Sequence, residues 1–217
     1  MIRTIQHRFA LALIATACAL PTRSFAQPAT ASPATALPST SSDSLSAQDR
    51  EILTTAEQLA SDATQALERW ISSKSISQDR LFARIYLPVP KTDPYKFTTP
   101  YDALAQRDFV APQDRALARS PTQVYAIITD INGYVAVHNS RYNQPLTGDA
   151  AADYVNNQGR RLLGDLASFA AGKNRARYLQ QRIQREAGDV VYEISVPVMV
   201  RGQHWGCVRV GYRRIEQ

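Results

Sequence analysis

Arg209 stands in an apolar, β-rich run and has the chemistry to bind a carboxylate. It lies between Val208 and Val210, so strand alternation turns its side chain to the face opposite theirs. An arginine on the inner face of a sheet needs an anionic partner, because an unpaired buried charge is costly. That partner is either an internal carboxylate, such as that of Glu193, or the carboxylate of a bound ligand.

A second group of residues could complete such a site. Arg160 and Arg161 are adjacent in a predicted helix, where a 100° offset turns only one of them toward the interior. Tyr134 and His138 share one face of a predicted strand, and Tyr125 falls on the neighbouring strand. Arginine with tyrosine and histidine supplies the bidentate donor and the flanking hydrogen-bond donors that a small carboxylate needs. Aromatic strand residues are also typical of a hydrophobic core.

His138 and His204 raise an alternative, a metal or haem site. Both fall on predicted strands, but the sequence lacks the close His, Cys and Asp spacing of zinc sites. It also contains no Cys-x-x-Cys-His haem-attachment motif, no Gly-x-Ser-x-Gly elbow and no phosphate loop. Cys207, in a predicted strand, is typical of a buried thiol rather than a reactive one. We therefore expect no metal, no cofactor and no enzymatic activity.

The N-terminus predicts export. Basic residues precede a short apolar run, and Ser24 and Ala26 supply the small side chains of a signal-peptidase site, so residues 1–26 are expected to be a signal peptide. The run is too short for a permanent membrane span. A lipid anchor on Cys18 is the alternative. We expect a periplasmic or secreted product that acts as a free protein, since no membrane span follows its core.

Without residues 1–26, the chain keeps 22 of its 25 basic residues and all 19 acidic ones, a net charge of +3. This small charge, without a basic cluster, argues against nucleic acid as a partner. Residues 27–46 are mainly Ala, Pro, Ser and Thr, which favours a flexible linker. Residues 47–217 are enough to bury one hydrophobic core and are expected to form a single domain.

A long helix opens this predicted domain over residues 47–73. Ser46 and Asp49 are typical of a helix N-cap and first turn, and apolar residues then recur at three- and four-residue steps. This apolar stripe either packs on a sheet, the interpretation we favour, or forms a dimer. The proline- and aromatic-rich stretch 86–121 predicts an ordered connector with a short helix over 101–107.

The C-terminal half predicts a five-stranded antiparallel sheet, on which the long helix packs to give an α+β fold. Gly133 stands where a tight turn after Asp130 requires a positive φ, so the first two strands form a hairpin. A single helix over 151–169 then leads to the last three strands. The predicted strands cover residues 125–129, 134–138, 177–185, 190–200 and 204–213.

Residues along the connector and the sheet follow a recognisable linear order. They are Pro88, Pro90, Thr92, Pro94, Thr99, Asp102, Asp130, Gly133, Tyr134, His138, Asn139, residues 144–149, Asn157, Arg161, Asp165, Arg185, Gly188, Pro197, Gly202, His204, Trp205, Gly206, Arg209, Gly211 and Tyr212. Over about residues 86–213, this order resembles the periplasmic single-Cache, PAS-like sensor region of bacterial methyl-accepting chemotaxis receptors. Gln158, Ile183 and Glu186 depart from that pattern.

The resemblance implies a signalling domain that binds a small extracytoplasmic solute, often a short carboxylate, and it favours Arg161 over Arg160. Two other functions stay open. One is a metal- or haem-associated redox sensor that uses His138 and His204. The other is a protein-interaction module with a vestigial pocket, whose N-terminal helix binds a receptor or a second copy of the chain. The expected ligand-binding residues are Tyr125, Tyr134, His138, Arg161 and Arg209.

Overall fold

Helix α1 (Ala47–Ser72) begins with a complete capping box in the computed structural model, which describes residues 37–39, 45–184 and 188–215. The Asp49 amide donates to Ser46 Oγ at 3.0 Å, and the Ser46 amide donates to the Asp49 carboxylate at 3.2 Å. The apolar stripe predicted from the sequence is buried along the helix, and the predicted helix over 47–73 is confirmed. None of the described helices is both long enough and apolar enough to cross a membrane.

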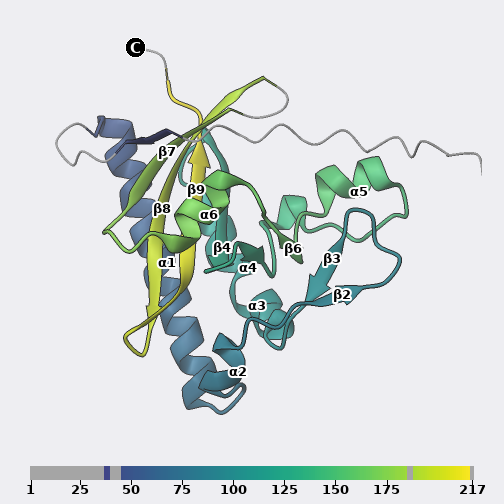
Figure 1. Cartoon of the computed structure of the whole chain (residues 1–217). Helices are drawn as coiled ribbons and strands as arrows, with labels where there is room; N and C mark the ends of the chain where they lie inside the picture. The colour runs from purple at the N-terminus through teal and green to yellow at the C-terminus, as the bar shows by residue number, and fades with distance from the viewer. Residues whose placement is uncertain (1–36, 40–44, 185–187, 216–217) are drawn as a thin grey trace, which may run out of the picture. The chain divides into compact units, whose positions relative to one another are not determined.

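The main sheet of the described residues has five antiparallel strands in the order β1-β7-β8-β9-β4 (Figure 1). Its strands are β1 (Leu37–Ser39), β4 (Gln123–Asp130), β7 (Leu179–Gln184), β8 (Val190–Val200) and β9 (Gln203–Tyr212). Val208 and Val210 of β9 pack in one core with α1, whereas Arg209 between them reaches Ser168 of α6 (Leu166–Lys173). The alternation predicted for β9 is therefore present, and α1 and α6 cover opposite faces of the sheet.

Four of the five predicted strands are found in this sheet, but the one over residues 134–138 is not. Its turn is as predicted: Gly133 has a φ of +80°, and its amide donates to Asp130 O at 3.0 Å. After the turn, β5 (Tyr134–Val135) pairs with β6 (Arg161–Leu162) in a separate two-stranded sheet. The fifth strand of the main sheet is β1, which pairs with β7.

Side chains explain why residues 134–138 do not extend the main sheet. The Ala126 amide of β4 donates to Asn139 Oδ1 at 3.0 Å, and the Ile128 amide donates to Gln113 Oε1 at 2.9 Å. Buried backbone donors need partners, and here amide side chains take the place of a neighbouring strand. The edge of β4 is closed without a further strand.

Strand β1 lies within the expected linker of residues 27–46. Its three residues pair antiparallel with β7, in the register Leu37 with Arg182 and Ser39 with Gln180. Composition alone did not indicate a strand here. The other residues of the expected linker, apart from Leu45 and Ser46, and all of the expected signal peptide lie outside the described residues.

The prediction of a single helix over 151–169 is wrong, because the chain forms α5 (Ala150–Asn156), strand β6 and then α6. Helix α5 ends at Asn156, and Gly159 beyond it lies where a Cβ would be 2.9 Å from Asn143 Oδ1. Arg160 follows with a positive φ of 59°. Asp165 then caps α6 by accepting from the Ser168 amide at 2.9 Å.

The connector carries more structure than its prolines suggested. Helix α3 (Asp102–Asp108) confirms the short helix predicted over 101–107. Before it, β2 (Leu87–Val89) and β3 (Lys96–Thr98) form a separate antiparallel pair that the sequence did not predict. The remaining elements are α2 (Gln78–Phe82), α4 (Val110–Leu117) and the 3₁₀ turn η1 (Ser140–Tyr142).

Candidate functional site

The buried face of the sheet under α6 holds an ion pair. Arg209 Nη2 lies 2.7 Å from Glu193 Oε2, and both side chains are almost fully buried. The same guanidinium donates to Ser168 Oγ at 2.6 Å, and the Tyr125 hydroxyl donates to Glu193 Oε2 at 2.6 Å. Burial raises the pKa of Tyr125 well above its ordinary value, and the Glu193 charge adds to this rise. Of the two partners considered for Arg209, the structure contains the internal one.

Cys207 lies on the same face of β9. Its thiol is buried 3.3 Å from Thr129 Oγ1. Burial raises the pKa of this thiol to about 11, so the reactive thiolate is scarce near neutral pH.

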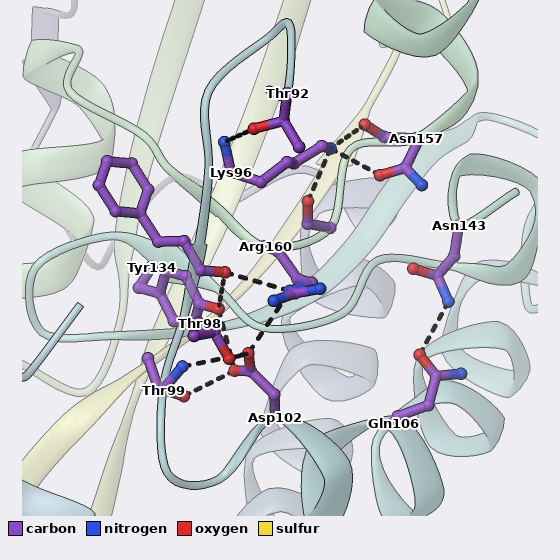
Figure 2. Close-up of polar contacts among 12 residues, drawn as sticks. Thr92, Lys96, Thr98, Thr99, Asp102, Gln106, Tyr134, Asn143, Asn157 and Arg160 are labelled. Atoms are coloured by element: carbon purple, nitrogen blue, oxygen red, sulfur yellow. Dashed lines mark hydrogen bonds and ion pairs between the residues drawn. The ribbon is translucent and has the colours of Figure 1, made fainter. Parts of the chain in front are cut away.

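Tyr134 belongs to a second polar cluster, which is centred on Asp102 (Figure 2). The Tyr134 hydroxyl lies 2.9 Å from Asp102 Oδ1, and Thr99 donates to the same carboxylate through its amide and its hydroxyl. Arg160 Nε lies 3.6 Å from Asp102 Oδ2. Burial and the Asp102 charge raise the pKa of Tyr134, so its hydroxyl stays protonated and donates hydrogen bonds. Asp102 thereby fixes β3, β5 and the start of α3 to one another.

Lys96, Arg160 and Arg161 form a third group, which we call the basic cluster. Lys96 is 3% exposed, and its ammonium donates to Asn157 Oδ1 at 2.6 Å and to Gly159 O at 2.9 Å (Figure 2). Burial lowers the pKa of Lys96 to about 8, and the charges of Arg161 and Arg160 act in the same direction. The charge of Asp153 acts in the opposite direction. Carbonyl oxygens satisfy the hydrogen bonds of this ammonium but do not neutralise its charge.

Arg161 is the least compensated member of the basic cluster. It is half-buried on β6, and its guanidinium lies 4.7 Å from the ring centre of Tyr154, which is itself exposed. No ion pair among the described residues involves Arg161, whereas Arg160 beside it is close to Asp102. Arg161 therefore has donors free for an anion.

His138 is buried and neutral. Its Nδ1 accepts from the Asn139 amide at 2.8 Å, so the remaining proton of the neutral ring is on Nε2. Burial lowers the pKa of His138 to about 3, and the charges of Arg141 and Arg161 lower it further. His138 can donate one hydrogen bond, but it does not carry the positive charge that an anion would attract.

The two histidines considered for a metal have different surroundings. His138 contacts the ring of Tyr142, with the ring centres 5.1 Å apart. Burial lowers the pKa of His204, and the charges of Arg175, Arg84 and Lys173 oppose its protonation. No contact found in the described part of the chain joins His138 to His204. Those residues also contain no group of three or more His, Cys, Asp or Glu side chains arranged to hold a metal ion.

A cavity of about 530 Å³, which is largely open to solvent, lies between the end of α4, the start of β4 and η1. Its walls carry side chains of both charges, together with small and apolar ones. The lining residues are Asp114, Leu117, Ala118, Ser120, Pro121, Gln123, Ser140 and Arg141. None of them was among the residues expected to bind a ligand.

The five expected ligand-binding residues thus fall into three groups. Tyr125 and Arg209 share the ion pair under α6, Tyr134 belongs to the Asp102 cluster, and the charge of Arg161 acts on His138. The sequence analysis missed Lys96, for which the flanking aromatic residues were the only signal. It also missed the cavity, because its charged residues come from segments with no motif.

A scan against models of protein families found no match, and a search of curated proteins found none either.

Proposed function

We propose that this chain is an exported binding domain for signalling, and that its basic cluster recognises a small carboxylate. The observation that carries the proposal is the charge of Arg161, which no carboxylate among the described residues neutralises. Lys96 stands close enough for the charge of Arg161 to lower its pKa. An anion that enters this field removes the repulsion between the two cations, so binding is favourable for electrostatic reasons.

The surroundings of Arg161 supply more than charge. The exposed ring of Tyr154 covers one face of the guanidinium, which leaves the N–H groups at its edge for a planar carboxylate. The linear order of residues that resembles Cache sensor regions includes both Arg161 and Asn157, which binds Lys96. Export rests on residues 1–26, and a periplasmic or secreted location is part of the same proposal.

The proposal also assigns a route for signalling. The apolar stripe of α1 packs on the sheet, so a receptor or a second copy of the chain would contact the polar face of α1. Glu51, Gln58 and Gln65 lie along that face. Loss of a homodimer or receptor complex when Glu51→Lys is combined with Gln58→Lys would support this route.

The direct test is calorimetric titration of the purified protein with small mono- and dicarboxylates. Arg161→Gln should weaken the best acid by about tenfold or more, since a charge-assisted hydrogen bond contributes roughly 1.5–3 kcal/mol. Its thermal stability should stay close to that of the wild type, because no ion pair of the described chain is lost. The matched control is Arg177→Gln, which removes an exposed arginine paired only with Glu57.

The pH dependence gives a second, independent measurement. The charge of protonated Lys96 strengthens the attraction of an anion to Arg161, so affinity should fall as pH rises through about 8, the pKa of Lys96. The carboxylate ligand remains ionised throughout that range. Lys96→Met should remove the dependence. An affinity that is unchanged in Arg161→Gln, or the absence of binding by every acid tested, would refute the proposal.

A further inference from the structure

The cavity beside α4 has one charge of each sign on its walls. Asp114 projects from α4, and Arg141 projects from η1. The Asp114 carboxylate accepts from the Ser140 amide at 2.9 Å and from Asn139 Nδ2 at 3.4 Å, so neutral donors hold it in place. The Arg141 guanidinium donates to Val124 O and lies 4.5 Å from the ring centre of Tyr142.

Hydrogen bonds hold the side chains of Asp114 and Arg141 in place, but the two side chains do not form an ion pair with each other. Within the described chain, no ion pair includes either Asp114 or Arg141. Asp114 accepts only from neutral donors and Arg141 donates to a neutral carbonyl, so the charge of each stays without an opposite charge beside it. A ligand that carries both charges could contact both residues at once.

Gln123 adds a polar atom without a partner. Its side chain lines the cavity at the start of β4, and the residue is 6% exposed. Its Oε1 is buried and has no hydrogen-bond partner in the described chain. A buried acceptor without a donor is unfavourable, and a ligand that brings an N–H group would remove that cost. The missing group is therefore a donor, which distinguishes this site from one for a simple anion.

We propose that this cavity binds a small zwitterion. Its ammonium group donates to Asp114 and to Gln123 Oε1, and its carboxylate accepts from Arg141. The volume of about 530 Å³ falls within the range that holds small ligands. The site goes beyond the proposed function, because none of its lining residues belongs to the basic cluster.

A series of linear ω-amino acids tests both charges and their separation. Glycine, β-alanine, 4-aminobutanoate and 6-aminohexanoate are titrated into the purified protein, together with butylamine and butanoate, which each carry one of the charges. One chain length should bind at least about tenfold more tightly than its amine or acid counterpart, as expected when two charged contacts replace one. If no amino acid of the series binds more tightly than both butanoate and butylamine, the proposal is overturned.

Variants identify the residues responsible. Gln123→Met and Arg141→Gln should each weaken the best zwitterion by about tenfold. Gln123→Met should not reduce the melting temperature, because it removes a group that has no partner. Arg115→Gln is the matched control, since Arg115 lies on α4, is exposed and pairs with Asp62.

The same titrations separate this site from the carboxylate site. Zwitterion binding should survive in Arg161→Gln, whatever the result for simple carboxylates. Loss of zwitterion binding in Arg161→Gln, with Gln123→Met and Arg141→Gln unaffected, would place the ligand at the basic cluster and refute this site.

Discussion

Arg209 shows how a single buried charge is stabilised within the chain. Glu193 Oε2 accepts from Arg209 and from Tyr125, and Ser168 accepts a further donor of the guanidinium. Gln181 Nε2 lies 3.4 Å from the other carboxylate oxygen. Strand alternation located Arg209 on the correct face, but it could not tell whether the anion came from the chain or from a ligand. The answer depended on Glu193, which lies on the neighbouring strand.

The ion pair makes Arg209 a residue of folding rather than of binding. Arg209→Met should lower the free energy of unfolding by roughly 3–5 kcal/mol, because Glu193 is left buried and unpaired. Arg209→Met combined with Glu193→Gln should recover a large part of that loss. Urea unfolding of the single and double variants measures both effects. A single variant as stable as the wild type would contradict the role given to the pair.

At the scale of elements, the secondary structure predicted from the sequence is most accurate where hydrophobic periodicity and turn residues indicate the same element. Strands β8 and β9 and the turn between them follow from alternating residues and from Gly202, which has a positive φ of 74°. Helix α1 follows from its cap and its apolar stripe. These features are local, so one segment suffices to specify them.

The errors have a common cause, which is a long-range contact that no local pattern reveals. Residues 134–138 have a strand composition, but Asn139 and Gln113 occupy the edge of β4 where that strand would pair. The expected helix over 151–169 ends at Asn156, because the residues that follow pair with distant segments: Asn157 bridges Asn143, and β6 pairs with β5. The residues of the candidate site also come together through long-range contacts that a local pattern does not predict. Arg161 was identified from its order in the sequence, whereas its neighbour Lys96 comes from a distant hairpin.

Strand β1 offers a test at the same scale. A chain that begins at residue 45 lacks the strand that pairs with β7 between Leu37 and Arg182. Amide hydrogen exchange in β7 should then accelerate several-fold relative to the chain that begins at residue 27, because β7 becomes an edge strand with only β8 beside it. Amides of the β4–β9 ladder should keep their rates and serve as the internal control. Unchanged exchange in β7 would show that β1 adds no protection.

For the molecule as a whole, the burial of titratable groups makes the stability of the fold depend on pH. The N-terminal capping box ties α1 to the end of β9, since Asp49 also accepts from Tyr212 of β9 and, at 2.8 Å, from Arg214 just beyond it. The pKa of Asp49 is lowered. Burial alone would raise that pKa, but hydrogen bonds from Tyr212, Gln180, Arg214 and Ser46 outweigh it. The stability that Asp49 contributes is present above its unfolded pKa of 3.8 and is lost as pH falls below it. Asp49 therefore does not account for a loss of stability that begins as pH falls below 6.5.

His138 accounts for such a loss. Its pKa is about 3 in the folded chain, below the ordinary 6.5, so the unfolded chain binds more protons between these values. Stability should therefore fall as pH drops below 6.5, by roughly 1–2 kcal/mol between pH 6.5 and pH 5, since one pKa unit corresponds to about 1.36 kcal/mol. His138→Gln should flatten this dependence. His204→Gln should flatten it less, because the pKa of His204 is lowered less than that of His138. Urea unfolding at pH 5, 5.5, 6 and 7 measures the slopes, and equal slopes for wild type and His138→Gln would show that His138 is not the residue that limits stability in mild acid.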